Sequence, residues 1–188
     1  MASHLVVAMT GASGAYAAEL LIERSPWPTM LIASDWGRKI YGHECGSFEK
    51  LADTADRVYE NSDMMAPPAS GSVPTVGMVI LPCSANTLGQ IAAGLGESLI
   101  SRAAHCHLKE RRPLVIGLRE APLTTIDVQN AAKAASAGAT LMPLCPPFYM
   151  FKGRKPDQIT MHELLTAYVD RILSLLGHPL ESTWEDVR

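Results

Sequence analysis

The chain lacks the surplus of positive charge that binding along a nucleic-acid backbone requires. Its 188 residues include 16 lysines and arginines against 19 aspartates and glutamates, which gives a formal net charge of -3. Proteins that neutralise the phosphates of DNA or RNA carry basic residues in excess and in clusters. We therefore exclude nucleic acid as a partner.

Long apolar runs are missing as well, and none of those present is long enough to cross a bilayer. The first residues enter what reads as a strand, without the layout of a signal peptide. We therefore expect a cytoplasmic protein that does not bind a membrane. With 47% hydrophobic residues, a chain of this length can bury its core as one domain without disulfides or metals.

Paired cysteines are also absent. The four cysteines are scattered along the chain at Cys45, Cys83, Cys106 and Cys145. Without a Cys-x-x-Cys pair they indicate neither a disulfide framework nor a zinc site, and we expect buried free thiols. The run His-Cys-His at 105–107 does not change this, because adjacent side chains on a helix point apart. No metal site is predicted.

The sequence does contain a pattern that repeats four times, in which a short apolar run is followed by a helical segment. The pairs are Leu5 to Met9 before Ala15 to Glu23, Met30 to Ala33 before Asp35 to Glu44, Met78 to Leu81 before Ser84 to Ala93, and Leu114 to Leu118 before Thr125 to Ser136. Strands that alternate with helices predict crossover connections and a parallel sheet covered on both faces. The fold class is therefore α/β, a Rossmann-like (flavodoxin-like) three-layer α/β/α domain. Asn61 to Thr75 reads as a loop, and loops of this length are typically functional or disordered. An amphipathic helix is expected from about His162 to Leu176.

Ligands of open α/β sheets bind at the carboxyl ends of the strands. Four segments follow the predicted strands in this way: Gly11 to Ala15, Ser34-Asp35, Cys83 to Thr87, and Arg119-Glu120. In the first, glycine lets backbone amides approach an anion, and Ser13 can cap the next helix or donate its hydroxyl. The turn is neither a P-loop nor the dinucleotide fingerprint.

Alternatives stay open for the other polar segments. Ser84 to Thr87 fits helix capping as well as ligand binding. The charges at Arg111 and Arg112 read as a solvated helix end, whereas Arg119-Glu120 lies where a ligand would be and fits either role.

Six ordered segments together resemble the flavin prenyltransferase family, the UbiX-like proteins formerly described as aromatic-acid carboxy-lyases. They are Met9 to Ala15, Met65 to Ser72, Leu99 to Ala104, Leu108 to Val115, Arg119 to Leu123, and Phe148-Tyr149. The resemblance covers almost the whole chain. It implies a homo-oligomer, usually a dodecamer, that binds FMN at subunit interfaces, with the segment from about 162 to 188 packing on a neighbouring subunit.

The resemblance also implies a reaction. The family joins the dimethylallyl group of dimethylallyl phosphate to reduced FMN, first at N5 and then at C6. The prenylated FMN passes to a partner UbiD-like decarboxylase. Breaking the allylic C–O bond requires cations around the departing phosphate.

The resemblance assigns roles residue by residue. The implied flavin contacts are Gly11, Ala12, Ser13, Ser34, Ser84, Ala85, Asn86, Thr87 and Arg119. The implied contacts to dimethylallyl phosphate are Arg102, Lys109, Tyr149 and Arg171. The implied proton carriers, or residues that orient a proton, are Ser13, Glu44 and Glu120.

The sequence departs from the family in three places. Met64 stands where many members carry Trp, so an aromatic face for an allylic cation is missing there, and Trp184 is the substitute that we expect. Met150 to Pro156 reads as an insertion, and Asp127 replaces a usual His. Two alternatives remain open. The first is a flavin-dependent cysteine decarboxylase, which Ser-Ala-Asn-Thr at 84–87 favours, although this chain lacks the catalytic His and the Pro-x-Met-Asn segment of that family. The second is a non-catalytic FMN carrier subunit.

Overall fold

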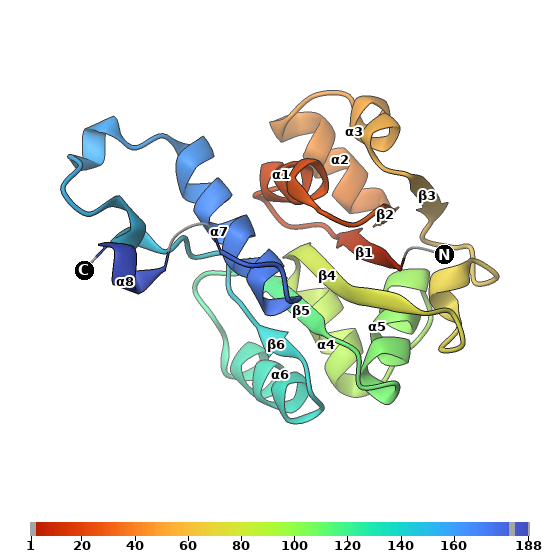
Figure 1. The fold of residues 1–188 in the computed structure, drawn as a ribbon. Helices are drawn as coiled ribbons and strands as arrows, with labels where there is room; N and C mark the ends of the chain where they lie inside the picture. Colours follow the sequence, from red (N-terminus) through yellow and green to blue (C-terminus); the bar gives the residue numbers. More distant parts are fainter. Residues whose placement is uncertain (1–2, 181–182, 188) are drawn as a thin grey trace.

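In the computed structural model, which describes residues 3–180 and 183–187, the centre is a six-stranded parallel sheet (Figure 1). Its strand order is β3-β2-β1-β4-β5-β6. The strands are β1 (His4–Met9), β2 (Thr29–Ala33), β3 (Arg57–Glu60), β4 (Thr75–Cys83), β5 (Leu114–Leu118) and β6 (Thr140–Leu141). This is a doubly wound order, whose direction reverses between β1 and β4. The predicted fold class is confirmed.

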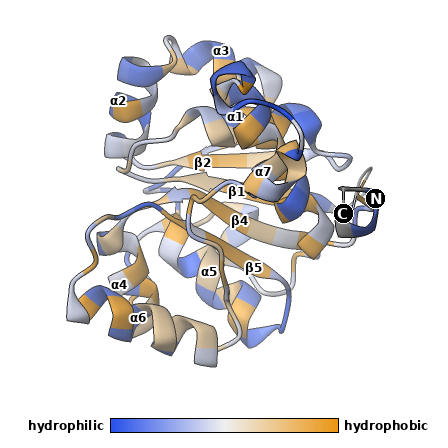
Figure 2. Cartoon of the chain, turned by 90° about the vertical axis from the view of Figure 1, so that its left-hand side faces the viewer, coloured by the Kyte–Doolittle hydropathy of each residue, from blue (hydrophilic) through white to orange (hydrophobic). Residues whose placement is uncertain are grey.

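Helices cover the sheet on both sides, as Figure 2 shows. One face carries α1 (Tyr16–Arg24), α2 (Asp35–Glu44), α3 (Phe48–Thr54) and α7 (Met161–Leu175), and the other carries α4 (Ala85–Ala93), α5 (Leu99–Lys109) and α6 (Thr125–Ser136). The short elements are η1 (Pro67–Ala69), η2 (Phe148–Phe151), η3 (Pro156–Gln158) and α8 (Trp184–Val187).

Alternation along the strands divides the core into two layers. In β1, Leu5, Val7 and Met9 join the layer under α1 and α7, whereas Val6 and Ala8 join the layer under α4 and α5. Successive side chains of a strand point to opposite faces, so a strand that is apolar at every position is buried on both sides. Burying one large aliphatic side chain contributes about 1.5–3 kcal/mol, and this contribution fixes the sheet between its two helix layers.

Among the elements that the sequence did not mark are α3 and the two edge strands of the sheet. β3 has mostly exposed residues, including Arg57 and Glu60, and β6 has only two residues. An edge strand is covered less than a central one, so its sequence need not be apolar. Neither edge strand therefore shows the apolar run that marks the four central strands.

Residues 61–74 form a loop around η1, as predicted, whereas Thr75 already belongs to β4. The helix α5 and the residues after it hold this loop in place. Arg102 Nε and Cys106 Sγ both donate to the carbonyl of Ala69, each at 3.1 Å. Arg112 donates to Val73 O at 2.7 Å and to Gly71 O. Arg112 is half-buried, so the prediction of a solvated helix end is wrong for this residue.

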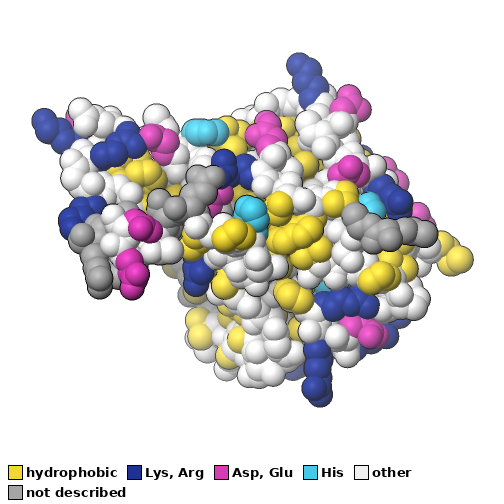
Figure 3. All heavy atoms as spheres, in the orientation of Figure 1, with side chains coloured by type: hydrophobic (Ala, Val, Ile, Leu, Met, Phe, Trp, Pro, Cys, Tyr) yellow, Lys and Arg dark blue, Asp and Glu magenta, His cyan; other side chains and the backbone are white. Residues whose placement is uncertain are grey.

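The segment before α7 forms an arm that projects from the sheet (Figure 1). It includes η2 and η3, and the same projection appears at the left of the space-filling view in Figure 3. Helix α8 contacts η2 of its own chain. At its base, the arm continues into α7, which is tied to α1 by Arg24–Asp170 (2.6 Å) and by Tyr16 Oη with His162 Nδ1 (2.7 Å).

Candidate functional site

A cavity of about 420 Å³ opens at the carboxyl ends of β1, β2 and β4, where the strand order reverses. Reversal points of this kind are where open α/β sheets bind ligands. The cavity is lined by Thr10, Gly11, Ser34, Trp36, Asn61, Ser84, Asn86, Thr87, Gln90, Ser98 and Ile100. Five of these residues, Gly11, Ser34, Ser84, Asn86 and Thr87, are predicted flavin contacts.

Thr10 joins the ends of the two strands that flank the reversal. Its hydroxyl donates to Pro82 O at 3.0 Å and accepts from the backbone N–H of Ser84 at 2.8 Å. Thr10 is only 3% exposed. The backbone around the cavity is therefore fixed by buried hydrogen bonds.

Three helices begin at this cavity, each with a serine at its N-cap. Ser34 Oγ accepts from Gly37 N at 3.0 Å, Ser84 Oγ from Thr87 N at 3.3 Å, and Ser98 Oγ from Ser101 N at 3.3 Å. Capping, one of the two roles predicted for Ser84, is confirmed. The remaining N–H groups and the positive ends of the helix dipoles favour an anionic ligand such as a phosphate.

The Gly-rich turn is held by a residue from another helix. Of the two roles open to Ser13, capping α1 is ruled out, because the cap position is Ala15 and has no side-chain hydrogen bond. Instead, Glu44 Oε2 accepts from Gly14 N at 2.9 Å and from Ala15 N at 2.8 Å. A carboxylate at this position also complements the dipole of α1.

Gly14 in this turn has a φ of +93°, and a Cβ there would lie 2.4 Å from Leu144 Cδ2. Only glycine adopts such a backbone without strain. Glycine is thus required at position 14, both by the positive φ and by the close approach of Leu144.

Among the residues that the structure describes, the side chains that line the cavity are hydroxyls, amides and two apolar groups, with no charge among them. They can bind a phosphate and the polar edge of a ring, but they include no acid or base. Arg119 and Glu120 lie at the next strand end, beside β4, where Arg119 N donates to Cys83 O at 2.9 Å. Both are exposed, and neither lines the cavity. Ala12, Ser13 and Ala85 also lie outside the lining.

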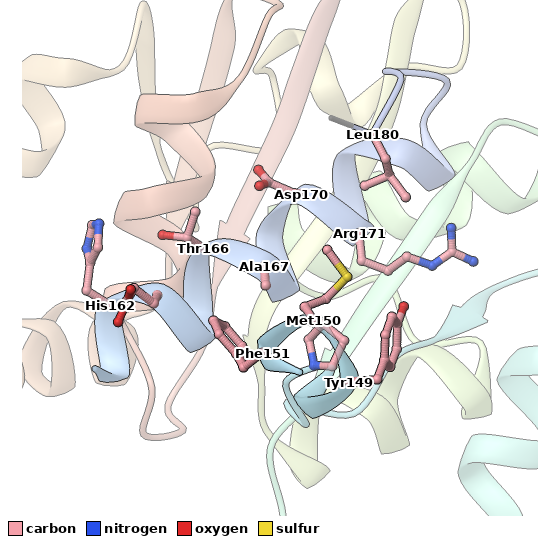
Figure 4. A pocket seen from close by; sticks show the side chains of 11 residues that line it. Tyr149, Met150, Phe151, His162, Thr166, Ala167, Asp170, Arg171 and Leu180 are labelled. Carbon is pink, nitrogen blue, oxygen red and sulfur yellow. The ribbon is translucent and has the colours of Figure 1, made fainter. Parts of the chain in front are cut away.

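A second cavity, of about 330 Å³, lies between α7 and η2. Tyr149 and Arg171, two of the predicted contacts to dimethylallyl phosphate, both line it, and His162 lies at its far end (Figure 4). Met150, Phe151, Ala167 and Leu180 supply apolar walls. Tyr149 and Arg171 therefore line one cavity within a single chain.

Arg102 and Lys109, the other two predicted contacts, do not reach this second cavity. Both lie on α5 beside the loop at Ala69 and Gly71, and Lys109 pairs with Glu110 at 2.9 Å. A single chain thus keeps the predicted phosphate-binding cations in two separate places. The side chain of Trp184, which we expect to supply the aromatic face for the allylic cation, lies outside the described residues.

Six lining residues were not assigned as flavin contacts from the sequence: Thr10, Trp36, Asn61, Gln90, Ser98 and Ile100. Asn61 follows the edge strand β3, which has no apolar run to mark it, so the sequence placed Asn61 only at the start of a loop. Its Oδ1 accepts from Ile100 N at 3.1 Å. Ser98 and Ser101 form a capping box at the start of α5, but Ser101 is not the Glu or Gln of the usual sequence signature.

The cysteines correct one further expectation. Cys83 and Cys106 are buried, Cys45 is half-buried, and Cys145 is exposed, so the prediction of buried thiols is wrong for Cys145. Burial raises the pKa of the Cys83 thiol to about 12 and that of Cys45 to about 11, which keeps both protonated at neutral pH.

The residues of the run 105–107 each face a different partner. His105 Nε2 lies 3.5 Å from Ile91 O, Cys106 contacts Ala69 O, and His107 Nδ1 lies 2.7 Å from Ala103 O. Over residues 3–180 and 183–187, the structure has no group of three His, Cys, Asp or Glu residues able to hold a metal ion. Within the same ranges, no helix combines the length and apolarity needed to span a bilayer.

Known proteins match this chain over nearly its full length. A family model described as Flavoprotein matches residues 1–163. Flavin prenyltransferase UbiX of Thermoplasma acidophilum is 38% identical over 175 residues, which cover 92% of this chain and 94% of that protein.

Two solved structures share the fold. The structure of AnUbiX (PadA1) in complex with FMN and dimethylallyl pyrophosphate superimposes with a TM-score of 0.90, at 36% identity over 98% of both chains. A dodecameric FMN-dependent UbiX-like decarboxylase from Escherichia coli O157:H7 superimposes with a TM-score of 0.87, at 34% identity over 96% of this chain and 98% of that one.

Proposed function

Since this chain belongs to the flavoprotein family and, within it, to the flavin prenyltransferases, we propose that it joins the dimethylallyl group of dimethylallyl phosphate to N5 and C6 of reduced FMN. The observation that carries this proposal is the cavity at the β1/β4 reversal. Its three serine-capped helix starts suit a phosphate, and its amide and hydroxyl side chains suit the polar edge of a flavin.

The residues of the chain have separate tasks in this proposal. Ser34, Ser84 and Thr87 bind and orient FMN, and the Gly-rich turn places Ser13 near N5. Arg119, beside the end of β4, balances the charge of the flavin or of the phosphate. Glu44 and Glu120 hold or move the protons that N5 and C6 lose. Orientation and fixed charge lower the barrier because they require no rearrangement during the reaction.

We propose that the binding site for the prenyl donor is formed by residues from two copies of the chain. In one chain, Tyr149 and Arg171 lie in the second cavity, whereas Arg102 and Lys109 lie beside the loop. An oligomer, for which the dodecameric relative from E. coli gives the precedent, would let one copy supply the arm and another the flavin cavity. The segment from about 162 to 188 would then pack on a neighbouring subunit as well as on its own η2.

Two further parts of the proposal concern the setting of the enzyme. The product is prenylated FMN, and we propose that a UbiD-like decarboxylase receives it as cofactor. A cytoplasmic location stays a prediction.

The test uses the purified chain with FMN under anaerobic reducing conditions. We expect dimethylallyl phosphate to be consumed and mass spectrometry to detect a flavin heavier by one prenyl unit. The diphosphate donor is tested in parallel. Unmodified FMN with both donors would contradict prenyl transfer and favour a carrier subunit, and decarboxylation of a cysteine-terminated peptide would favour the cysteine decarboxylases.

A further inference from the structure

One aromatic side chain of the flavin cavity has no role in the function proposed so far. Trp36 is the second residue of α2, directly after the N-cap Ser34 and Asp35. Its side chain lines the cavity and is 65% exposed. Among the described residues that line this cavity it is the only aromatic one, and Ile100 is the only other large apolar group.

The position of Trp36 is fixed on one side by Gly11. A Cβ at Gly11 would lie 2.6 Å from Trp36 Cβ, so the absence of a side chain at Gly11 is what allows α2 to begin this close to the first turn. The contact joins the turn after β1 to the start of α2. Trp36 is therefore held at the cavity by backbone geometry rather than by a covering of apolar side chains.

One face of the indole already has a partner. The ammonium group of Lys39 lies 4.6 Å from the centre of the ring, which is a cation–π contact. Lys39 is itself exposed, so this contact does not bury the ring. The opposite face is the one that remains for a planar ligand, and a flat aromatic ring prefers an aromatic partner in an offset stack.

We propose that Trp36 stacks against the isoalloxazine ring of bound FMN and supplies the main aromatic contact in the flavin cavity. This inference rests on the proposed function, because it takes FMN as the ligand of this cavity. Apart from Ile100, the remaining side chains of the lining are polar and suit the phosphate, the ribityl chain and the ring edge. They offer no second aromatic face among the described residues. Trp36 is thus a flavin-positioning residue rather than an acid or a base.

Three variants test this proposal. Trp36→Ala keeps the Cβ that contacts Gly11 but removes the ring, and Trp36→Phe keeps a ring that donates electrons poorly. Trp27→Phe is the matched control, since Trp27 is half-buried, packs edge-on against His178 with ring centres 6.2 Å apart, and does not line this cavity.

The first measurement is FMN affinity by titration calorimetry, without turnover. We expect Trp36→Ala to weaken FMN binding about tenfold, as is typical for the loss of one stacked ring. Trp36→Phe should recover most of the affinity, and Trp27→Phe should bind like the wild type. Equal FMN affinity of Trp36→Ala and the wild type would overturn the inference.

The second measurement is the emission of protein-bound FMN. An indole in van der Waals contact with a flavin quenches its emission by electron transfer, and this effect fades steeply with distance. We expect bound FMN to be brighter in Trp36→Phe and unchanged in Trp27→Phe. If emission rises in Trp184→Phe and not in Trp36→Phe, the inference is wrong. A wild type that binds no FMN would instead contradict the proposed function itself.

Discussion

Glu44, the last residue of α2, accepts a hydrogen bond from the backbone N–H of Gly14, 30 residues earlier, at 2.9 Å. The same carboxylate oxygen accepts from Ala15 N, so a side chain of α2 satisfies two backbone N–H groups just before α1. The family resemblance assigns Glu44 to proton transfer, and the structure adds a contact that fixes the Gly-rich turn. These two roles can be separated experimentally.

Glu44→Ala removes the acceptor of both N–H groups. We expect it to lower the free energy of unfolding by about 1 kcal/mol, as for the loss of a helix cap, and to weaken FMN binding. Glu44→Gln retains an oxygen that can accept and should recover most of the stability. Chemical denaturation and FMN titration measure both effects. If Glu44→Gln also loses prenylation while FMN stays bound, Glu44 acts on a proton in addition to holding the turn.

Gly14→Ala should destabilise the protein by at least about 1 kcal/mol, because a side chain at positive φ is strained and its Cβ would meet Leu144. Gly42→Ala is the matched control. Gly42 lies in α2, and a Cβ added there would have nothing within 4 Å, so alanine should stabilise the helix by about 0.5–1 kcal/mol. Thermal denaturation of the two variants should shift in opposite directions, and a shift in the same direction would contradict this account of the turn.

His107 should make stability depend on pH. It is 1% exposed, and burial lowers its pKa below the ordinary value of 6.5. The unfolded chain therefore binds a proton at a higher pH than the folded chain does, and stability falls as pH drops from about 6.5 toward the lowered folded pKa. Above that window the contribution is complete.

We expect His107→Gln to be less stable than the wild type at pH 8 and to lose less stability between pH 8 and pH 5. Melting temperatures across this range provide the measurement, with the half-buried His105→Gln as control. An unchanged pH slope in His107→Gln would remove His107 as its source. The substitution also removes the contact between His107 Nε2 and Thr75 Oγ1 (2.8 Å), which is why absolute stability falls.

Glu120→Gln should retain FMN but reduce prenyl transfer at least about 100-fold, the usual size of an acid–base contribution. The exposed Glu49→Gln on α3 is the control for loss of one carboxylate. Titration with FMN and mass spectrometry of the product separate binding from chemistry. Unchanged turnover in Glu120→Gln would remove this residue from the mechanism.

Arg171→Gln should raise KM for dimethylallyl phosphate at least about tenfold, because a guanidinium–phosphate bond is charge-assisted. FMN affinity should stay unchanged, since Arg171 lines the second cavity and not the flavin cavity. Arg57→Gln on the exposed edge strand β3 is the control. An effect of Arg171→Gln on FMN affinity alone would contradict the assignment.

The sequence by itself determined the central strands, the helical segment that follows each of them, and capping as one of the two roles of Ser84. Apolar periodicity and capping are local, so a run such as Leu5 to Met9 carries its own signal. The sequence also marked Gly14 as part of a turn. The family resemblance, rather than any single motif, then pointed to FMN.

Tertiary structure alone decided which helix starts meet at one cavity, and therefore brought Asn61, Ser98 and Trp36 beside Gly11. It also made Glu44, and not Ser13, the side chain that accepts from the backbone N–H groups before α1. It placed Arg171 and Lys109 in separate regions of one chain. These relationships depend on strand order and on close packing between distant segments. Neither spacing nor periodicity along the chain encodes them, because residues far apart in sequence become neighbours only through their positions in the folded sheet.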